Sequence, residues 1–217
     1  MALKIGVIGA TGMAGSAITK AALDQGIEVT AFIRNEEKAR GMFGDQPTYR
    51  VIDVFDIGKP DIADLDVVVD AFSLGHDPKN VDQHLELAQH LVELVKGSDK
   101  PRLFFILGAA SLNIGGGKQL LDQLETLPNK EQWIATPRAQ HKEYNFLLQA
   151  KDVNWVAISP SRTFKPGDFA PYELGHNDVL TNAEGKSEVT SGTVGRVIVD
   201  EIMNPAHHNE RFTVVNK

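Results

Sequence analysis

Residues 3–15 read LKIGVIGATGMAG, and this stretch decides the fold. Its first six residues are apolar except for Lys4 and Gly6, which predicts a buried strand, and helical periodicity begins at Met13. The glycines after the strand have a GxxGxxG spacing, which permits a tight turn and lets a pyrophosphate approach the helix N-terminus. The alternative is a glycine-rich turn without a ligand. The position after the first strand favours a dinucleotide site, which would comprise Gly9, Thr11, Gly12, Met13 and Gly15.

The composition narrows the possible function classes. Of 217 residues, 22 are Lys or Arg and 29 are Asp or Glu, which gives a formal charge of −7. This acidic balance argues against a nucleic-acid partner and against attachment to anionic lipid. The chain contains no cysteine, which excludes disulfides, thiolate metal sites and a cysteine nucleophile. Neither a targeting segment nor an apolar run of about 18 residues is visible, so we expect a cytoplasmic protein without a membrane partner.

Strands and helices alternate outward from the glycine stretch. We expect strands at residues 3–8, 27–33, 49–52, 66–72, 102–107, 155–158 and 211–215. The helices between them are expected at 13–25, 36–41, 78–97, 137–150 and 192–203, with Asn35 and Asp77 as helix starts. This alternation predicts an α/β protein with a Rossmann-like, doubly wound parallel sheet flanked by helices.

Two irregular stretches, 111–130 and 160–186, each follow the carboxyl end of an expected strand. Open α/β sheets bind ligands at that edge, and loops of this length in a compact domain are usually functional. Because the sequence contains no linker and no repeat, we expect a single domain over residues 1–217. Its part from about 160 to 217 would form a small substrate lobe.

The end of the second expected strand indicates which cofactor is bound. An acidic residue usually binds a free ribose 2′-hydroxyl there, whereas a 2′-phosphate favours arginine. The chain has Arg34 at this position, and the first carboxylate after it is Glu36. We therefore favour NADP(H) over NAD(H); an exposed arginine at a helix start is the alternative. Asp53 follows the third strand and could accept from the adenine amino group, or it could be a helix cap.

Residues 1–73 resemble the nucleotide-binding half of the atypical short-chain dehydrogenase/reductase family. The resemblance implies that the Asp53-Val54 step and the Ala71-Phe72-Ser73 segment line the cofactor. The stretches 154–160, 164–167 and 210–214 are similar to bacterial NADH-flavin reductases related to biliverdin reductase B, which extends the resemblance over nearly the whole chain. It also implies that Pro160 lies at the cofactor.

The acid of the catalytic short-chain enzymes is missing. Those enzymes pair a tyrosine with a lysine four residues on, because the ammonium lowers the pKa of the tyrosine that protonates a carbonyl oxygen. Counting back from Pro160 places Pro137 and His141 at the two positions, and Tyr144 has Leu148 four residues later. Two candidates remain: Ser111, where the superfamily places a hydroxyl near the nicotinamide, and His141. A loop-turn serine and a structural histidine are the alternatives.

These observations support three hypotheses about function. The first is an NAD(P)H-dependent oxidoreductase that transfers hydride to a flavin, a quinone or a similar conjugated acceptor, with the flavin as a substrate and not a tightly bound cofactor. The second is a regulatory protein of the NmrA-like type, which senses NAD(P) without turnover. The third is a nucleotide-sugar epimerase or dehydratase, ranked last because that group keeps Tyr and Lys. We expect no metal site, and either a monomer or a homodimer.

Overall fold

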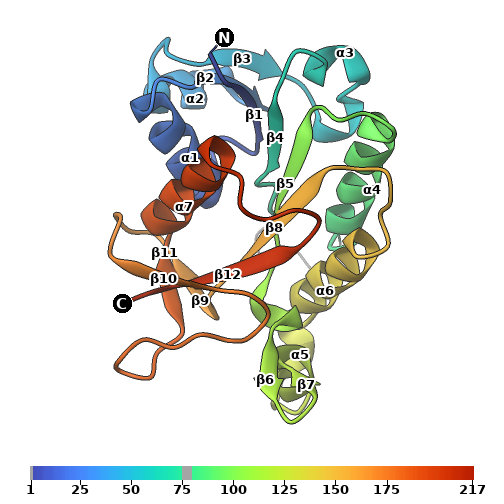
Figure 1. The fold of residues 1–217 in the computed structure, drawn as a ribbon, viewed down its shortest axis with the longest axis vertical. Coiled ribbons are helices and arrows are strands. Elements are labelled where there is room, and N and C mark those ends of the chain that lie inside the picture. The colour runs from blue at the N-terminus through green and yellow to red at the C-terminus, as the bar shows by residue number, and fades with distance from the viewer. Residues whose placement is uncertain (1, 75–79) are drawn as a thin grey trace.

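A central sheet organises the protein (Figure 1). The structure is a computed structural model that describes residues 2–74 and 80–217. Among these residues, eight strands form the sheet in the order β10-β12-β8-β5-β4-β1-β2-β3. Every neighbouring pair is parallel except β10 and β12. The strands are β1 (Lys4–Ile8), β2 (Glu28–Ile33), β3 (Thr48–Val51), β4 (Val67–Asp70), β5 (Arg102–Ile106), β8 (Trp155–Pro160), β10 (Tyr172–Gly175) and β12 (Arg211–Asn216).

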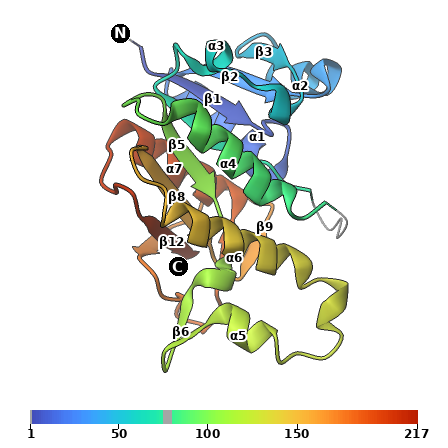
Figure 2. The same cartoon turned by 90° about the vertical axis from the view of Figure 1, so that its right-hand side faces the viewer.

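Helices cover both faces of this sheet (Figure 2). One apolar cluster joins the sheet to α1 (Met13–Asp24), α2 (Glu36–Phe43) and α7 (Ser191–Met203). A second cluster on the opposite face includes α3 (Lys59–Ile62), α4 (Gln83–Val95) and α6 (Ala135–Leu147). Alternate residues of each buried strand point to opposite faces, so the strands are apolar on both sides. The expected doubly wound α/β sheet is confirmed.

Local chemistry explains where several elements begin and end. Asn35 caps α2 as expected, because its side chain accepts a hydrogen bond from the Lys38 backbone at 2.8 Å. β4 ends at Asp70, two residues before the expected end, because the carboxylate accepts from the Phe72 backbone N–H at 2.9 Å and turns the chain. The expected helix start at residues 77 and 78 lies outside the described residues. The described part of that helix, α4, begins at Gln83.

The two stretches expected to be irregular contain short elements. The first holds a hairpin of β6 (Asn113–Gly115) and β7 (Lys118–Gln119), followed by α5 (Leu120–Leu124) and the 3-10 turn η3 (Lys130–Gln132). The second holds β10 and also β9 (Thr163–Lys165), which pairs with β11 (Glu188–Thr190). Strands of two to four residues carry too few alternating positions to be recognised by periodicity. No helix among the described residues is both long and apolar enough to cross a bilayer.

Candidate functional site

Three glycines form a cradle between β1 and α1. Gly9 follows β1 with a φ of +69°, and a Cβ there would lie 2.7 Å from the Ala71 carbonyl oxygen. A Cβ on Gly15 would lie 2.2 Å from the Gly9 carbonyl oxygen, so α1 packs directly against the turn. Gly12 is different, since its φ is −79° and a Cβ would meet only the Gly9 oxygen at 3.2 Å. The fold therefore requires glycine at positions 9 and 15 and constrains position 12 less strongly.

The first turn of α1 suits an anion. No side chain caps this end of the helix, and its first turn contains no acidic residue. The backbone N–H groups there carry the positive end of the helix dipole. Thr11 is half-buried beside the turn, and Met13 is 39% exposed. The expected phosphate-binding residues thus lie together on one turn.

The carboxyl end of β4 forms the opposite wall of this cradle. β1 and β4 are neighbours, yet the chain continues from β1 to a helix on one face and from β4 to a helix on the other. Such a switch point is where doubly wound sheets bind dinucleotides. Ala71 is buried against Gly9, and Ser73 is exposed at the end of the segment. The Phe72 ring lies edge-on to the rings of Phe55 and His84.

Arg34 and Asp53 follow β2 and β3 along the same edge of the sheet. Arg34 is exposed and forms no hydrogen bond or ion pair with any residue that the structure describes. Asp53 is the N-cap of the 3-10 turn η1 (Val54–Asp56), and its side chain accepts from the Phe55 backbone at 3.1 Å. One carboxylate oxygen of Asp53 is therefore used as a helix cap, which the sequence analysis gave as the alternative role. Val54 is half-buried beside it.

Ser111 lies at the other half of the edge, after β5, at the end of the 3-10 turn η2 (Ala109–Ser111). Its side chain points inward and is 1% exposed. The Ser111 hydroxyl accepts a hydrogen bond of 2.9 Å from Nη1 of Arg211, the first residue of β12. Arg211 also donates to the Ser159 hydroxyl at 3.1 Å and to the Asn177 side chain at 2.8 Å. Ser111 thus belongs to a buried polar network centred on Arg211. Pro160, the last residue of β8, is buried beside Ser159.

His141 joins the same network from α6. Its Nε2 donates to the Gln119 side-chain oxygen at 2.7 Å, and its Nδ1 accepts from the Asn145 amide at 3.1 Å. These partners define a neutral imidazole with the proton on Nε2. Burial lowers the pKa of His141, which favours the same neutral form. Gln119 in turn donates to the Ser111 carbonyl at 3.2 Å, so the two catalytic candidates are linked through one side chain.

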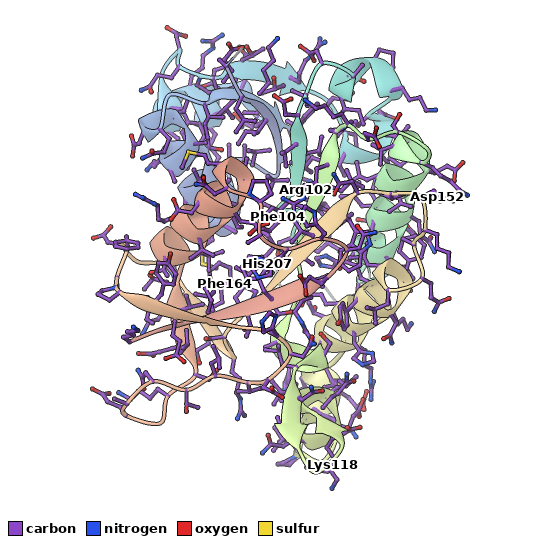
Figure 3. All side chains as sticks on the ribbon, in the orientation of Figure 1. Arg102, Phe104, Lys118, Asp152, Phe164 and His207 are labelled. Carbon is purple, nitrogen blue, oxygen red and sulfur yellow. The ribbon has the colours of Figure 1, made fainter. Side chains whose placement is uncertain are left out.

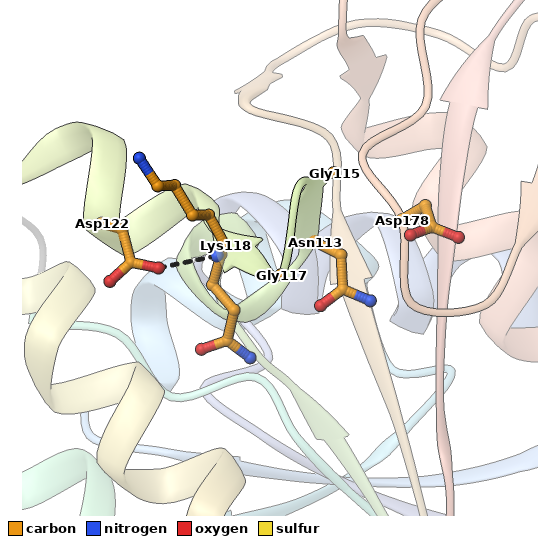
Figure 4. Close-up of a pocket in the computed structure, with 7 residues that line it drawn as sticks. Asn113, Gly115, Gly117, Lys118, Asp122 and Asp178 are labelled. Carbon is orange, nitrogen blue, oxygen red and sulfur yellow. Dashed lines mark hydrogen bonds between the residues drawn. The ribbon is translucent and has the colours of Figure 1, made fainter.

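A polar pocket of about 510 Å³ opens beside this network (Figure 4). The two long stretches form it together, because Asn113 and Val179 each donate a backbone hydrogen bond across the gap, to Asn177 and Asn113. Its volume is in the range of small-molecule sites. The backbone N–H of Gln119 donates to Asp122 at its rim, at 2.8 Å. The lining residues are Asn113, Gly115, Gly117, Lys118, Gln119, Asp122 and Asp178.

Pro137 and Tyr144, which the sequence analysis compared with the tyrosine acid of the short-chain enzymes, do not line the pocket. Pro137 occupies the first turn of α6 and carries no proton to give. Tyr144 is 8% exposed, and its ring stacks on the Arg211 guanidinium at 4.4 Å from the ring centroid. Its hydroxyl lies 3.5 Å from the Asn177 side-chain oxygen. Tyr144 therefore belongs to the buried network.

Two buried carboxyl groups lie on the face of the sheet opposite α1. Asp70 is at the end of β4 and Glu143 is on the inner face of α6, and both are buried. Burial raises the pKa of Asp70 to about 7. Burial also raises the pKa of Glu143 well above its ordinary value, and the charge of Asp70 raises it further. One Glu143 oxygen has no hydrogen-bond partner in the described part of the chain.

Sequence reasoning missed the residues that connect the site. Arg211 was part of an expected strand, and only its charge at the start of a buried strand could have marked it. Gln119 and Asn177 lie in the stretches expected to be irregular, and a single sequence gives no signal that they meet. The site residues proposed from the sequence lie along one edge of the sheet.

The chain is similar to several known proteins. The sequence profile of the NAD(P)H-binding family matches residues 9–205. "Uncharacterized protein YwnB" of Bacillus subtilis (strain 168) is 33% identical over 221 residues, 99% of each chain. The structure of a Lactobacillus casei protein has a TM-score of 0.92 and 34% identity and covers 99% of both chains. That of "a putative NADH-flavin reductase" from Streptococcus pneumoniae TIGR4 has a TM-score of 0.88 and 28% identity, over 99% of this chain and 100% of that one.

These similarities agree with the resemblance to the atypical short-chain dehydrogenase/reductases that the sequence motifs indicated. The profile covers both the glycine cradle and most of the carboxyl-terminal part, and the structures match over almost the whole fold. The chain belongs to the NAD(P)H-binding family.

Proposed function

We propose that the protein is an NADPH-dependent oxidoreductase that transfers hydride to a flat conjugated acceptor, such as a flavin or a quinone. The observation that supports the proposal is that a glycine cradle and a polar pocket both follow the carboxyl ends of strands in one sheet. The glycine cradle, at the end of α1 that no side chain caps, would bind the pyrophosphate. The polar pocket between residues 113–119 and Asp178 would bind the acceptor. The Streptococcus pneumoniae relative supports a flavin as the acceptor by its description.

The cofactor would extend along the carboxyl edge of the sheet. The N–H groups of the first α1 turn would bind the pyrophosphate, and Gly12 would leave room for it. The unpartnered guanidinium of Arg34 would bind a 2′-phosphate, which is the basis for proposing NADPH over NADH. The segment Ala71–Phe72–Ser73 would line the ribose side, with Pro160 and the η2 turn nearer the nicotinamide.

The acceptor class follows from the missing acid. Bound NADPH supplies a hydride from C4 of its dihydronicotinamide ring. A simple ketone also needs a proton in the same step, and a general acid typically contributes about 10²–10⁴-fold to such a step. Pro137 has no proton to give, and His141 has its Nε2 proton bonded to Gln119. A conjugated ring that is stable as an anion after hydride addition can take its proton from water.

Oxidation of NADPH by the purified protein tests this proposal. The absorbance of NADPH is followed with FMN, FAD, riboflavin or a benzoquinone, and with a simple ketone as the contrasting substrate. We expect turnover with a flavin or quinone and little or none with the ketone. If NADPH binds tightly and is oxidised no faster than in buffer, the enzyme proposal is wrong and a dinucleotide-sensing role takes its place.

A further inference from the structure

Arg211 is a buried cation whose donors are all bonded to neutral acceptors. The residue is 2% exposed. Its Nε donates to the Asn177 side-chain oxygen at 3.2 Å, and Nη2 donates to the same oxygen at 2.8 Å and to the Ser111 carbonyl at 3.4 Å. Nη1 donates to the hydroxyl groups of Ser111 and Ser159. The five N–H groups of a guanidinium are therefore all used, and none is left to bind an anion.

No carboxylate neutralises this charge by direct contact in the described part of the chain. The Tyr144 ring covers one face of the guanidinium at 4.4 Å, a cation–π contact that leaves the charge in place. Burial lowers the pKa of Arg211, while Tyr144 and the exposed Asp178 raise it. A guanidinium stays protonated under such conditions. The other buried arginine, Arg102, contrasts with it, since it forms an ion pair of 3.1 Å with the buried Glu201.

The charge of Arg211 lies behind the polar pocket, whose lining carries the charged side chains of Lys118, Asp122 and Asp178. Arg211 donates hydrogen bonds to Ser111 and Asn177. Ser111 is two residues before the pocket residue Asn113, and Asn177 directly precedes the pocket residue Asp178. A second bond connects Ser111 to Gln119, which lines the same pocket. Arg211, Ser111 and Ser159 are buried although Asn177 is exposed, so the field of the guanidinium is screened less than that of a surface charge.

We infer that Arg211 is an electrostatic positioning residue for the proposed reaction, and that its charge stabilises the acceptor as it becomes an anion. The inference rests on the proposed function. Hydride transfer breaks the C–H bond at C4 of the dihydronicotinamide and moves two electrons and one proton to the acceptor ring. The nicotinamide is oxidised and becomes cationic, and the acceptor is reduced and becomes an anion, which takes a second proton from water. Arg211 acts through the hydroxyl and amide groups between it and the pocket, as an electrostatic substitute for the missing tyrosine and lysine.

Asn177→Asp is the most direct test, because it places a carboxylate in contact with the Arg211 guanidinium and removes no hydrogen-bond acceptor. An Asp can accept the same hydrogen bonds, so the variant is expected to fold. Asn182→Asp is the matched control: it adds the same charge to the same stretch, where the Asn182 oxygen accepts from the Glu184 and Lys186 backbones in a turn that suits Asp equally. Steady-state kinetics with NADPH and riboflavin would measure kcat and KM in both variants.

We expect kcat to fall about tenfold in Asn177→Asp, less than the loss of a direct oxyanion donor, and to stay unchanged in Asn182→Asp. The dissociation constant of NADPH should not change in either. Arg211→Lys should keep more of kcat than Arg211→Met, because lysine keeps the charge. Equal values of kcat in the two Asp variants would overturn the inference, as would equal losses in Arg211→Lys and Arg211→Met.

A binding measurement separates this inference from the proposed function. Under anaerobic conditions the parent should bind reduced riboflavin, which ionises near neutral pH, more tightly than oxidised riboflavin, which is neutral. Asn177→Asp should reduce that preference and Asn182→Asp should keep it. Turnover without such a preference contradicts the role of Arg211 alone, whereas a parent that neither binds nor reduces any flavin contradicts the proposed function and this inference with it.

Discussion

Gly12 and Gly15 belong to the same sequence motif, but the structure restricts a side chain at these two positions to different degrees. A side chain at position 15 would collide with the backbone of the β1–α1 turn, whereas a side chain at Gly12 would point away from most protein atoms. Gly12 therefore separates ligand binding from folding better than its neighbours do. The same reasoning applies to Arg34, which has no structural partner among the described residues to lose.

Gly12→Val is predicted to fold and to lose binding of both NADPH and NADH, because the new side chain would occupy the space in front of the helix N-terminus. Isothermal titration with each cofactor would measure the loss, and thermal unfolding would confirm the fold. Gly15→Ala is the contrasting variant, and it should be destabilised by about 2 kcal/mol or more because its Cβ meets backbone atoms. A folded Gly12→Val protein with parental affinity for NADPH would refute the dinucleotide cradle.

Arg34→Ala is predicted to weaken NADPH binding by about 1–3 kcal/mol, the scale of a lost hydrogen bond to a charged group. NADH lacks the 2′-phosphate, so its affinity should change little. Arg50→Ala, which removes an exposed arginine within β3, is the control and should affect neither cofactor. Equal losses for NADPH and NADH, or no loss, would contradict the assignment of Arg34.

At the level of elements, the inner face of α6 holds an acid against the end of β4. The carboxyl groups of Asp70 and Glu143 are both buried and both have a raised pKa. Each therefore binds a proton more readily in the folded protein than in the unfolded chain. Because the folded state holds more protons above pH 4, both groups favour the folded state in acid. The contribution of Asp70 is lost as the pH rises through about 7.

Asp70→Asn is therefore predicted to flatten the loss of stability between about pH 4 and pH 7, since an amide does not titrate over that range. Urea unfolding at a series of pH values would give the free energy of unfolding of the parent and the variant. Asp99→Asn, which changes an exposed aspartate, should follow the parental curve. A parental slope in Asp70→Asn would show that this carboxyl group does not carry the effect.

The elements also show how far sequence reasoning reaches. Buried parallel strands such as β1 and β8 are continuous apolar runs, and they were predicted to within about two residues. The cap at Asn35 depends on four adjacent residues and was equally visible. The hairpin at 113–119 and strand β10 are set by contacts with distant segments, which no local pattern encodes. For the site, the sequence placed its residues on one edge of the sheet but gave no sign of Arg211 as the centre of a network.

Over the whole molecule, two buried arginines anchor opposite regions. Arg102, at the amino end of β5, is paired with Glu201 of α7 and also donates to the carbonyl of His207 (Figure 3). The Glu201 carboxylate also accepts from the His207 ring at 2.9 Å. This cluster ties α7 to the sheet, away from the proposed site. Arg211 lies on the helix α6 side and ties together the stretches that form the pocket.

Arg102→Met is predicted to destabilise the protein by about 1–3 kcal/mol, because Glu201 loses its ion pair but keeps hydrogen bonds from His207 and the Ala206 backbone. Chemical denaturation would measure the change. The KM for the acceptor should stay at the parental value in the protein that remains folded. A large rise in that KM would mean that the two regions are coupled, contrary to their separation in the structure.

The order of the strands has a consequence for biosynthesis. β12 lies between β8 and β10, although β10 precedes it in the chain by more than thirty residues. β10 therefore cannot join the sheet until β12 has paired with β8. Arg211 is the first residue of β12, so it enters the structure at the same stage. Strands β1 to β4, which flank the glycine cradle, can pair with one another as soon as the first third of the chain has been synthesised. The pocket and Arg211 need residues that are synthesised later. A ribosome-bound chain would thus acquire the means to hold a cofactor well before it could do any chemistry with it.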